Sequence, residues 1–86
     1  MRVVIPTLLD RYTEGQREVQ GAGGNVGEVL ADLEARYPGI RFRLVDEHDR
    51  IRRHIHVFVG RELAADLETP VGADDTVKIV GALSGG

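Results

Sequence analysis

An α+β domain, with one amphipathic helix packed on a mixed four-stranded sheet, is predicted by three observations. Short runs rich in β-branched residues occur near both ends of the chain. A single longer segment between them has apolar residues at helical spacing. One such helix can cover one face of a sheet, which is the two-layer arrangement expected of this class.

The first two strands are expected at residues 2–5 and 17–20. Pro6 ends the first strand, because proline lacks the N–H group that a sheet ladder needs. Turn-forming residues occupy the stretch from Asp10 to Gly15. The two strands are therefore predicted to form a hairpin with a long connection.

The helix is predicted to begin after Asn25, a favourable N-cap residue, with Glu28 placed to complete a capping box. Pro38-Gly39 is a typical signal for the end of a helix. Between these limits, one face carries the apolar residues Val26, Val29, Leu30, Leu33 and Tyr37.

Residues 40–53 show no clean period and are expected to be a loop, with a short turn or strand at 43–45. Two further strands are expected at 55–59 and 76–80. The order strand, strand, helix, strand, strand matches the β-grasp (ubiquitin-like) architecture. We therefore expect a β-grasp domain over residues 1–80 and a flexible C-terminal diglycine tail over residues 81–86.

Composition narrows the possible functions. The chain has 86 residues, no cysteine and a formal net charge of −3. Binding to a nucleic-acid backbone needs a basic excess, so no nucleic-acid partner is expected. No apolar run approaches the length of a membrane span or a secretory signal, so no membrane association is expected and the cytoplasm is the expected location. A cysteine nucleophile is excluded.

Several segments resemble the MoaD/ThiS family of ubiquitin-like sulfur carrier proteins, and most closely its CysO-like branch. They are Ile5–Leu9, Tyr12–Gln16, Asn25–Leu30, Tyr37–Ile40 and the final Gly85-Gly86. The resemblance covers essentially the whole chain. It departs from the branch at His54–Gly60 and Gly81–Ser84, which leaves the acceptor partner open.

The resemblance implies a carrier that is not itself an enzyme. An E1-like adenylating enzyme would transfer AMP from ATP to the carboxylate of Gly86, and a sulfur donor would displace AMP to leave a thiocarboxylate. The acceptor would be an enzyme of the cysteine synthase type, which the resemblance favours, or one that makes molybdopterin, thiamine or a thiolated natural product. No permanently bound cofactor is implied, because the activating enzyme consumes the ATP.

The last residues suit this chemistry. Glycine has no side chain, so Gly85 and Gly86 form a slim end that can enter the nucleotide site of another protein. Leu83 is the large apolar side chain of the tail and is expected to anchor it in an apolar pocket of the partner, beside Ser84. The alternative is that Leu83 folds back onto the rim of the domain.

A docking surface is predicted from strand alternation. Phe58 should lie on the outward face of its strand, with His54 and His56. Val4 and Val80 share this face if their strand neighbours Val3, Ile5, Val77 and Ile79 point inward. An exposed apolar cluster on a sheet often marks a site of partner binding.

Other features favour plain structural roles. His48, His54 and His56 lack the cysteine or carboxylate partners of a structural zinc site, so no metal is expected. A basic cluster is interpreted as a solvated loop, with contact to a partner as the alternative; it consists of Arg50, Arg52 and Arg53. Two further functions stay open: a modifier conjugated to lysines through the same tail, and an interaction domain with an incidental tail.

Overall fold

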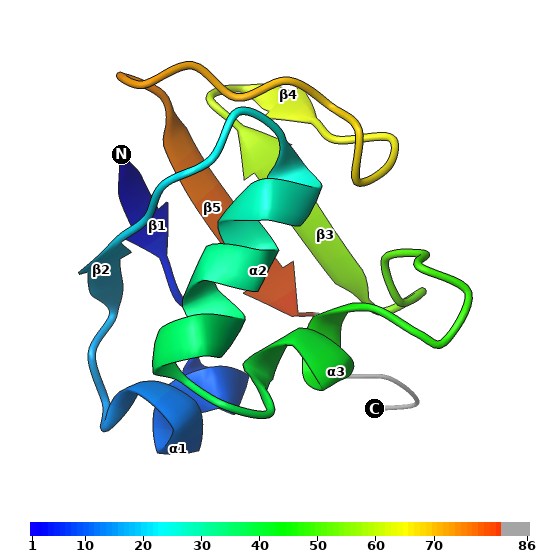
Figure 1. Ribbon diagram of the computed structural model, residues 1–86. Coiled ribbons are helices and arrows are strands. Elements are labelled where there is room, and N and C mark those ends of the chain that lie inside the picture. Colours follow the sequence, from blue (N-terminus) through cyan, green and yellow to red (C-terminus); the bar gives the residue numbers. More distant parts are fainter. Residues whose placement is uncertain (82–86) are drawn as a thin grey trace.

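The computed structural model describes residues 1–81, which fold into a sheet with helical segments on one side (Figure 1). In chain order the elements are β1 (Arg2–Val4), the 3₁₀ turn η1 (Thr7–Leu9), α1 (Asp10–Thr13), β2 (Glu18–Gln20), α2 (Val26–Arg36), α3 (Ile40–Leu44), β3 (Ile55–Val59), β4 (Glu62–Leu63) and β5 (Thr76–Gly81).

The strands form one mixed sheet in the order β2-β1-β5-β3-β4. β5 lies at its centre, parallel to β1 and antiparallel to β3. The sheet has five strands where four were predicted, because β4 consists of only two residues and shows no alternation in the sequence. β5 extends to Gly81, one residue beyond the predicted end of its strand.

The predicted cap of α2 is confirmed, with one shift. The side-chain Oδ1 of Asn25 accepts a hydrogen bond from the backbone N–H of Glu28 at 2.8 Å. The carboxylate of Glu28 accepts in return from the N–H of Gly24 at 2.7 Å, one residue before the position of a standard capping box. The backbone N–H groups of Gly24 and Glu28, which would otherwise lack a partner at the start of the helix, are thereby both hydrogen-bonded.

The core lies between α2 and one face of the sheet (Figure 1). The predicted apolar face of α2 is buried at Val26, Val29, Leu30 and Leu33, and Tyr37 packs against its margin. From the sheet, the residues predicted to point inward are buried as well, at Val3, Ile5, Val77 and Ile79, and Val57 of β3 is buried beside them. The apolar faces of the helix and of the strands therefore pack together in a single apolar layer.

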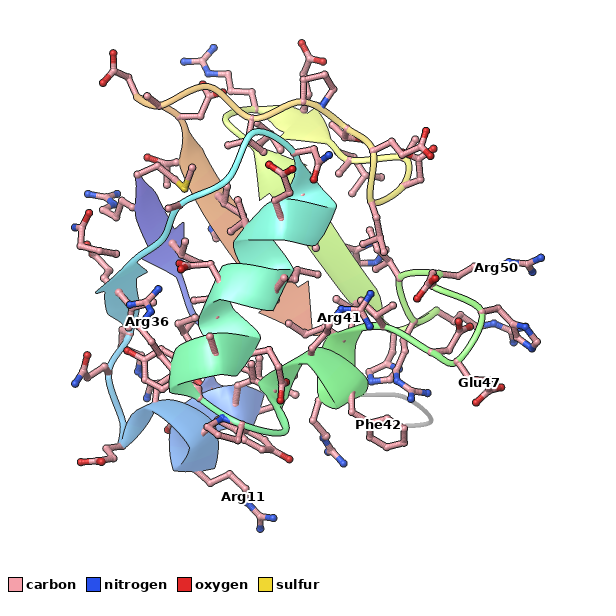
Figure 2. All side chains as sticks on the ribbon, in the orientation of Figure 1. Arg11, Arg36, Arg41, Phe42, Glu47 and Arg50 are labelled. Atoms are coloured by element: carbon pink, nitrogen blue, oxygen red, sulfur yellow. The ribbon has the colours of Figure 1, made fainter. Side chains whose placement is uncertain are left out.

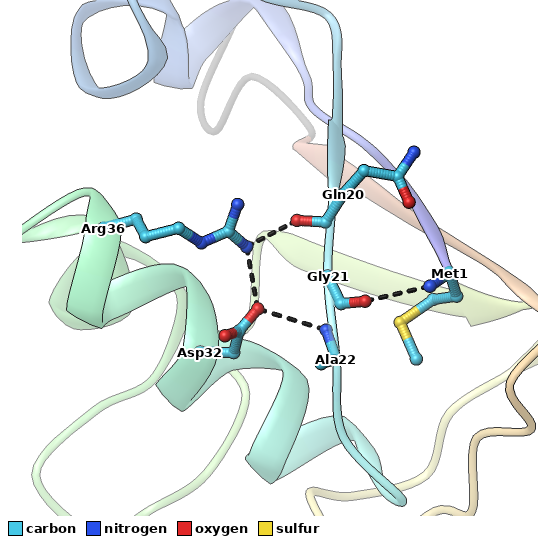
Figure 3. Close-up of polar contacts among 6 residues, drawn as sticks. All are labelled: Met1, Gln20, Gly21, Ala22, Asp32 and Arg36. Carbon is cyan, nitrogen blue, oxygen red and sulfur yellow. Dashed lines mark hydrogen bonds and ion pairs between the residues drawn. The ribbon is translucent and has the colours of Figure 1, made fainter.

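Polar contacts hold α2 beside the edge strand β2 (Figure 3). Asp32 accepts from the backbone N–H of Ala22 at 3.1 Å and pairs with Arg36 at 2.7 Å. Arg36 also donates to the carbonyl of Gln20. The helix is thus attached to the chain that leads out of β2, which limits its sliding across the sheet.

The connection between β1 and β2 contains helical turns, η1 and α1, where turn-forming residues were predicted. Arg17 closes this connection through an ion pair with Asp10 at 2.7 Å and a hydrogen bond to Thr7 at 3.0 Å. The hairpin pairing itself is confirmed, with Val3 opposite Val19.

The prediction of a loop at residues 40–53 is wrong for its first part, because residues 40–44 form α3. The carboxylate of Glu34 accepts hydrogen bonds from the N–H groups of Gly39 and Arg41, both at 2.9 Å, and these bonds hold the pKa of Glu34 below its usual value. Gly39 has φ +97°, a conformation that glycine adopts without strain. A helix this short does not repeat its apolar residues often enough to show a period.

No helix within residues 1–81 is both long and apolar enough to cross a bilayer.

We predict that Asn25→Ala lowers the free energy of unfolding by about 1 kcal/mol, because the first turn of α2 loses its side-chain acceptor. Asn25→Asp keeps an acceptor and should remain within about 0.5 kcal/mol of the parent chain. Urea unfolding followed by circular dichroism measures both. Equal stability of the alanine and aspartate variants would contradict the role of the cap.

Candidate functional site: the open sheet face and the end of β5

The face of the sheet opposite α2 carries a row of side chains across four strands. Val4 lies opposite Lys78, Lys78 opposite Phe58, and Phe58 opposite Leu63. Val4 and Phe58 are half-buried and Leu63 is 56% exposed. Strand alternation thus places Phe58, Val4 and Val80 on one face, as expected, with Val80 in the adjacent row opposite His56. We call this surface the open face.

Leu63 is a residue of the open face that sequence analysis missed. It follows a turn in which Gly60 and Arg61 join Val59 to its partner Glu62. Gly60 has φ +63°, as the first turn residue of a type II′ hairpin requires. Val59-Gly60-Arg61-Glu62 was therefore an available hairpin signal, but the short strand after it gave no alternation to support it.

A groove of about 520 Å³ opens on this face where β1 and β5 meet η1. Its walls include Val4, Pro6, Leu8, Lys78, Val80 and Gly81. The groove is apolar over most of its wall, with the Lys78 ammonium and Arg17 at its margin. Such a surface suits an apolar side chain of a partner, flanked by an acidic one.

Gly81, the last residue of β5, is closely covered by Leu8. A Cβ atom built on Gly81 would overlap the Cδ2 atom of Leu8 and lie 3.1 Å from its Cγ. Ile55, the strand partner of Gly81, lies on another side of the same position. The path of the chain at the end of β5 is therefore set by contacts from η1 and β3.

The remaining predicted site residues, Leu83, Ser84, Gly85 and Gly86, lie outside the described residues. Their roles stay predictions. Gly81 is the point from which they continue, so the open face and Gly81 are the parts of the predicted site that the structure describes.

The three histidines do not form a metal site with carboxylates in the described part of the chain. His56 lies on the open face opposite Val80, and His48 contacts Glu47 at 3.5 Å in the loop after α3. Over residues 1–81, no group of three histidine, cysteine or acidic side chains is placed to hold a metal ion.

A β-grasp domain with an open apolar face beside the start of a diglycine-ending segment defines a ubiquitin-like carrier or modifier. The ThiS family model matches residues 3–86. The sulfur carrier protein CysO of Mycobacterium tuberculosis (strain ATCC 25618 / H37Rv) is 37% identical over 98% of this chain and 96% of its own length.

Two solved structures are also similar. CysO in the Amycolatopsis orientalis BexX/CysO complex aligns with a TM-score of 0.91 at 39% identity, covering 99% of this chain and 98% of its own. SAMP1 from Haloferax volcanii aligns with a TM-score of 0.78 at 27% identity, covering 100% and 98% of the two chains.

The chain belongs to the ThiS family. Its near-full-length likeness to CysO proteins makes it a sulfur carrier protein and not a catalyst, and confirms the β-grasp prediction. The alternative of a protein modifier is not favoured, because the likeness to SAMP1 is weaker in both sequence and structure than the likeness to CysO.

We predict that Gly81→Ala lowers the free energy of unfolding by about 1 kcal/mol, at the low end of the range for overpacking, because only the end of the flexible Leu8 side chain must move to admit the new methyl group. In a Leu8→Ala background the same change should cost clearly less. A double-mutant cycle by urea unfolding measures this coupling. Purely additive effects would show that Leu8 does not restrain the end of β5.

Proposed function

We propose that the carboxylate of Gly86 is the activated group of this carrier. An E1-like enzyme binds ATP, the carboxylate attacks the α-phosphorus, and pyrophosphate leaves to give an acyl-adenylate. A sulfur donor then attacks the acyl carbon and AMP leaves, so that one oxygen of Gly86 is replaced by sulfur. The near-full-length likeness to CysO sulfur carriers, which extends through residue 86, is the observation that carries this proposal.

The structure supports separate roles for the folded domain and for the C-terminal segment that follows it. Five residues follow Gly81 in the sequence, and an extended chain of that length reaches about 17 Å. The carrier can therefore dock with its folded part outside the cleft of the enzyme while Gly86 reaches the nucleotide. The chain supplies no acid, base or cofactor, and the activating enzyme binds and consumes the ATP.

Recognition of the tail is assigned to Leu83, Ser84 and Gly85. Leu83 fills an apolar pocket of the partner and fixes the register of the residues after it. Gly85 lacks a side chain, which permits close approach of the enzyme backbone. Ser84 offers one hydroxyl group between them for hydrogen bonding.

Docking of the folded part is assigned to the open face. Phe58, Val4 and Val80 provide its apolar centre, and Leu63 extends it to the edge strand β4. A few residues near the centre of an interface contribute most of its binding energy when water is excluded around them. The groove beside Leu8 continues this surface to the end of β5.

The acceptor is proposed to be an enzyme that binds the same carrier after sulfur loading. The solved complex of BexX with CysO supports an enzyme as the acceptor. The resemblance to the CysO-like branch favours an acceptor of the cysteine synthase type. An acceptor that makes molybdopterin, thiamine or a thiolated natural product is a separate outcome, which assays of sulfur transfer from the loaded carrier to each acceptor distinguish.

Incubation with ATP, sulfide and the cognate activating enzyme should convert the chain to a species about 16 Da heavier. Intact-mass spectrometry detects it, and fragmentation must place the change at Gly86, because oxidation of Met1 adds nearly the same mass. The Gly86 deletion variant is the matched control and should stay unmodified. No change in the parent chain would contradict the proposed function.

Phe58→Ala should raise the carrier concentration needed for half-maximal adenylation by about ten-fold, because an aromatic anchor is lost from the interface. Its unfolding free energy should fall by less than about 1 kcal/mol, since Phe58 is only half-buried in the free chain. Kinetics of ATP–pyrophosphate exchange and urea unfolding give the two values. A large loss of stability with unchanged kinetics would assign Phe58 to the fold instead.

A further inference from the structure

A second surface feature lies beside the end of β5, on the side of α3. It is a hollow of about 230 Å³ lined by Phe42, Arg43, Arg52 and His54, and we call it the basic hollow. Figure 2 shows Phe42 projecting outward from α3. Its side chain is 67% exposed, which makes it the most exposed large apolar residue within residues 1–81.

Arg52 is held against this aromatic ring. Its guanidinium carbon lies 4.8 Å from the ring centroid of Phe42, and its Nε–H donates to the carbonyl oxygen of the same residue at 2.8 Å. The backbone N–H of Arg52 also donates to Leu44 at 2.9 Å. Ring and guanidinium thus form one preorganised unit, in which the terminal nitrogens of Arg52 make no hydrogen bond to the described residues.

The positive charge of the hollow is not neutralised by the described part of the chain. Four arginines within residues 1–81 lie in ion pairs with acidic residues, and Arg43 and Arg52 are not among them. The chain as a whole carries a formal net charge of −3. The basic hollow is therefore a local departure from the charge of the molecule.

The hollow is connected to Gly81 through short contacts. The N–H of Ile55 donates to the carbonyl of Arg52 at 2.9 Å, and Ile55 is the strand partner of Gly81. His54 directly precedes Ile55. The start of the C-terminal segment consequently has the apolar groove of Leu8 and Val80 on one side and the basic hollow on another.

We propose that the basic hollow binds an acidic segment of the activating enzyme, at the mouth of the cleft that receives Gly86. This inference rests on the proposed function and adds a second contact to the open face. A carboxylate of the enzyme accepts hydrogen bonds from the terminal nitrogens of Arg52 and from Arg43, since guanidinium groups match carboxylates in geometry. An apolar side chain next to that carboxylate covers Phe42.

The open face and the basic hollow contribute differently to docking. The open face contributes the burial of apolar surface. The basic hollow contributes attraction between opposite charges, and it lies beside Gly81, where the C-terminal segment starts. Complementary charges mainly raise the rate of correct encounter and fix orientation. The hollow therefore aligns the end of β5 with the cleft before the tail enters it.

The test is carrier-dependent ATP–pyrophosphate exchange by the purified cognate activating enzyme. Arg43→Glu combined with Arg52→Glu should raise the KM for the carrier about ten-fold or more and leave kcat within two-fold. Phe42→Ala should raise the KM about five-fold. Increasing NaCl from about 50 to 300 mM should narrow the gap between the charge-reversed and parent chains, because salt screens exposed charges.

Arg50→Glu is the matched control. It makes the same charge reversal in the loop after α3, where Figure 2 shows Arg50 pointing away from the body of the domain. Its KM should stay within two-fold of the parent value. Because Arg52 also bonds to α3, Arg43→Glu alone provides a variant that leaves that contact intact, and circular dichroism verifies the fold of each chain.

A KM for the double variant equal to that of Arg50→Glu would overturn this inference while the proposed function stands. Normal activation with impaired sulfur delivery to the acceptor would overturn it too, since the hollow would then serve the acceptor. If the parent chain supports no exchange, the proposed function and this inference both fail.

Discussion

The packing of α2 against the sheet is the interaction on which the rest of the structure depends. It buries Val3 of β1, Ile55 and Val57 of β3, and Val77 and Ile79 of β5, and it leaves the alternate residues of the same strands on the other side. Because one set of strand residues is buried in the core, the alternate set is left on the surface. The buried set is Val3, Val57, Val77 and Ile79, and the surface set is Val4, Lys78, Phe58 and Val80. The surface to which we assign docking is thereby obtained without any additional element.

The central position of β5 has a functional consequence. Its end at Gly81 is braced by η1 through Leu8 and by β3 through Ile55, so the diglycine-ending segment starts from a fixed point of the domain. In the proposed function the last residue is delivered into two different partners, which requires such a reference point. Specificity then resides in the surfaces around it, where the apolar groove and the basic hollow differ in chemistry.

A carrier also has to be released after each encounter. The open face is of mixed character, with Lys78 at the centre of its apolar row, and the basic hollow is electrostatic. Mixed surfaces of this kind favour short-lived complexes over permanent ones. This agrees with the proposed function, in which the chain visits an activating enzyme and an acceptor in turn.

The helix α2 and the outward position of Phe58 were determined by the sequence itself. Asn25, Glu28 and the spacing from Val26 to Leu33 specify α2, because caps and helical periodicity are local properties. Alternation in the strands likewise placed Phe58 outward. Tertiary structure alone decided the rest: α3 depends on the carboxylate of Glu34, β4 on pairing with β3, and the pairing of Leu8 with Gly81 joins residues from opposite ends of the chain. Such contacts leave no periodic signal, because each depends on where a distant segment comes to lie.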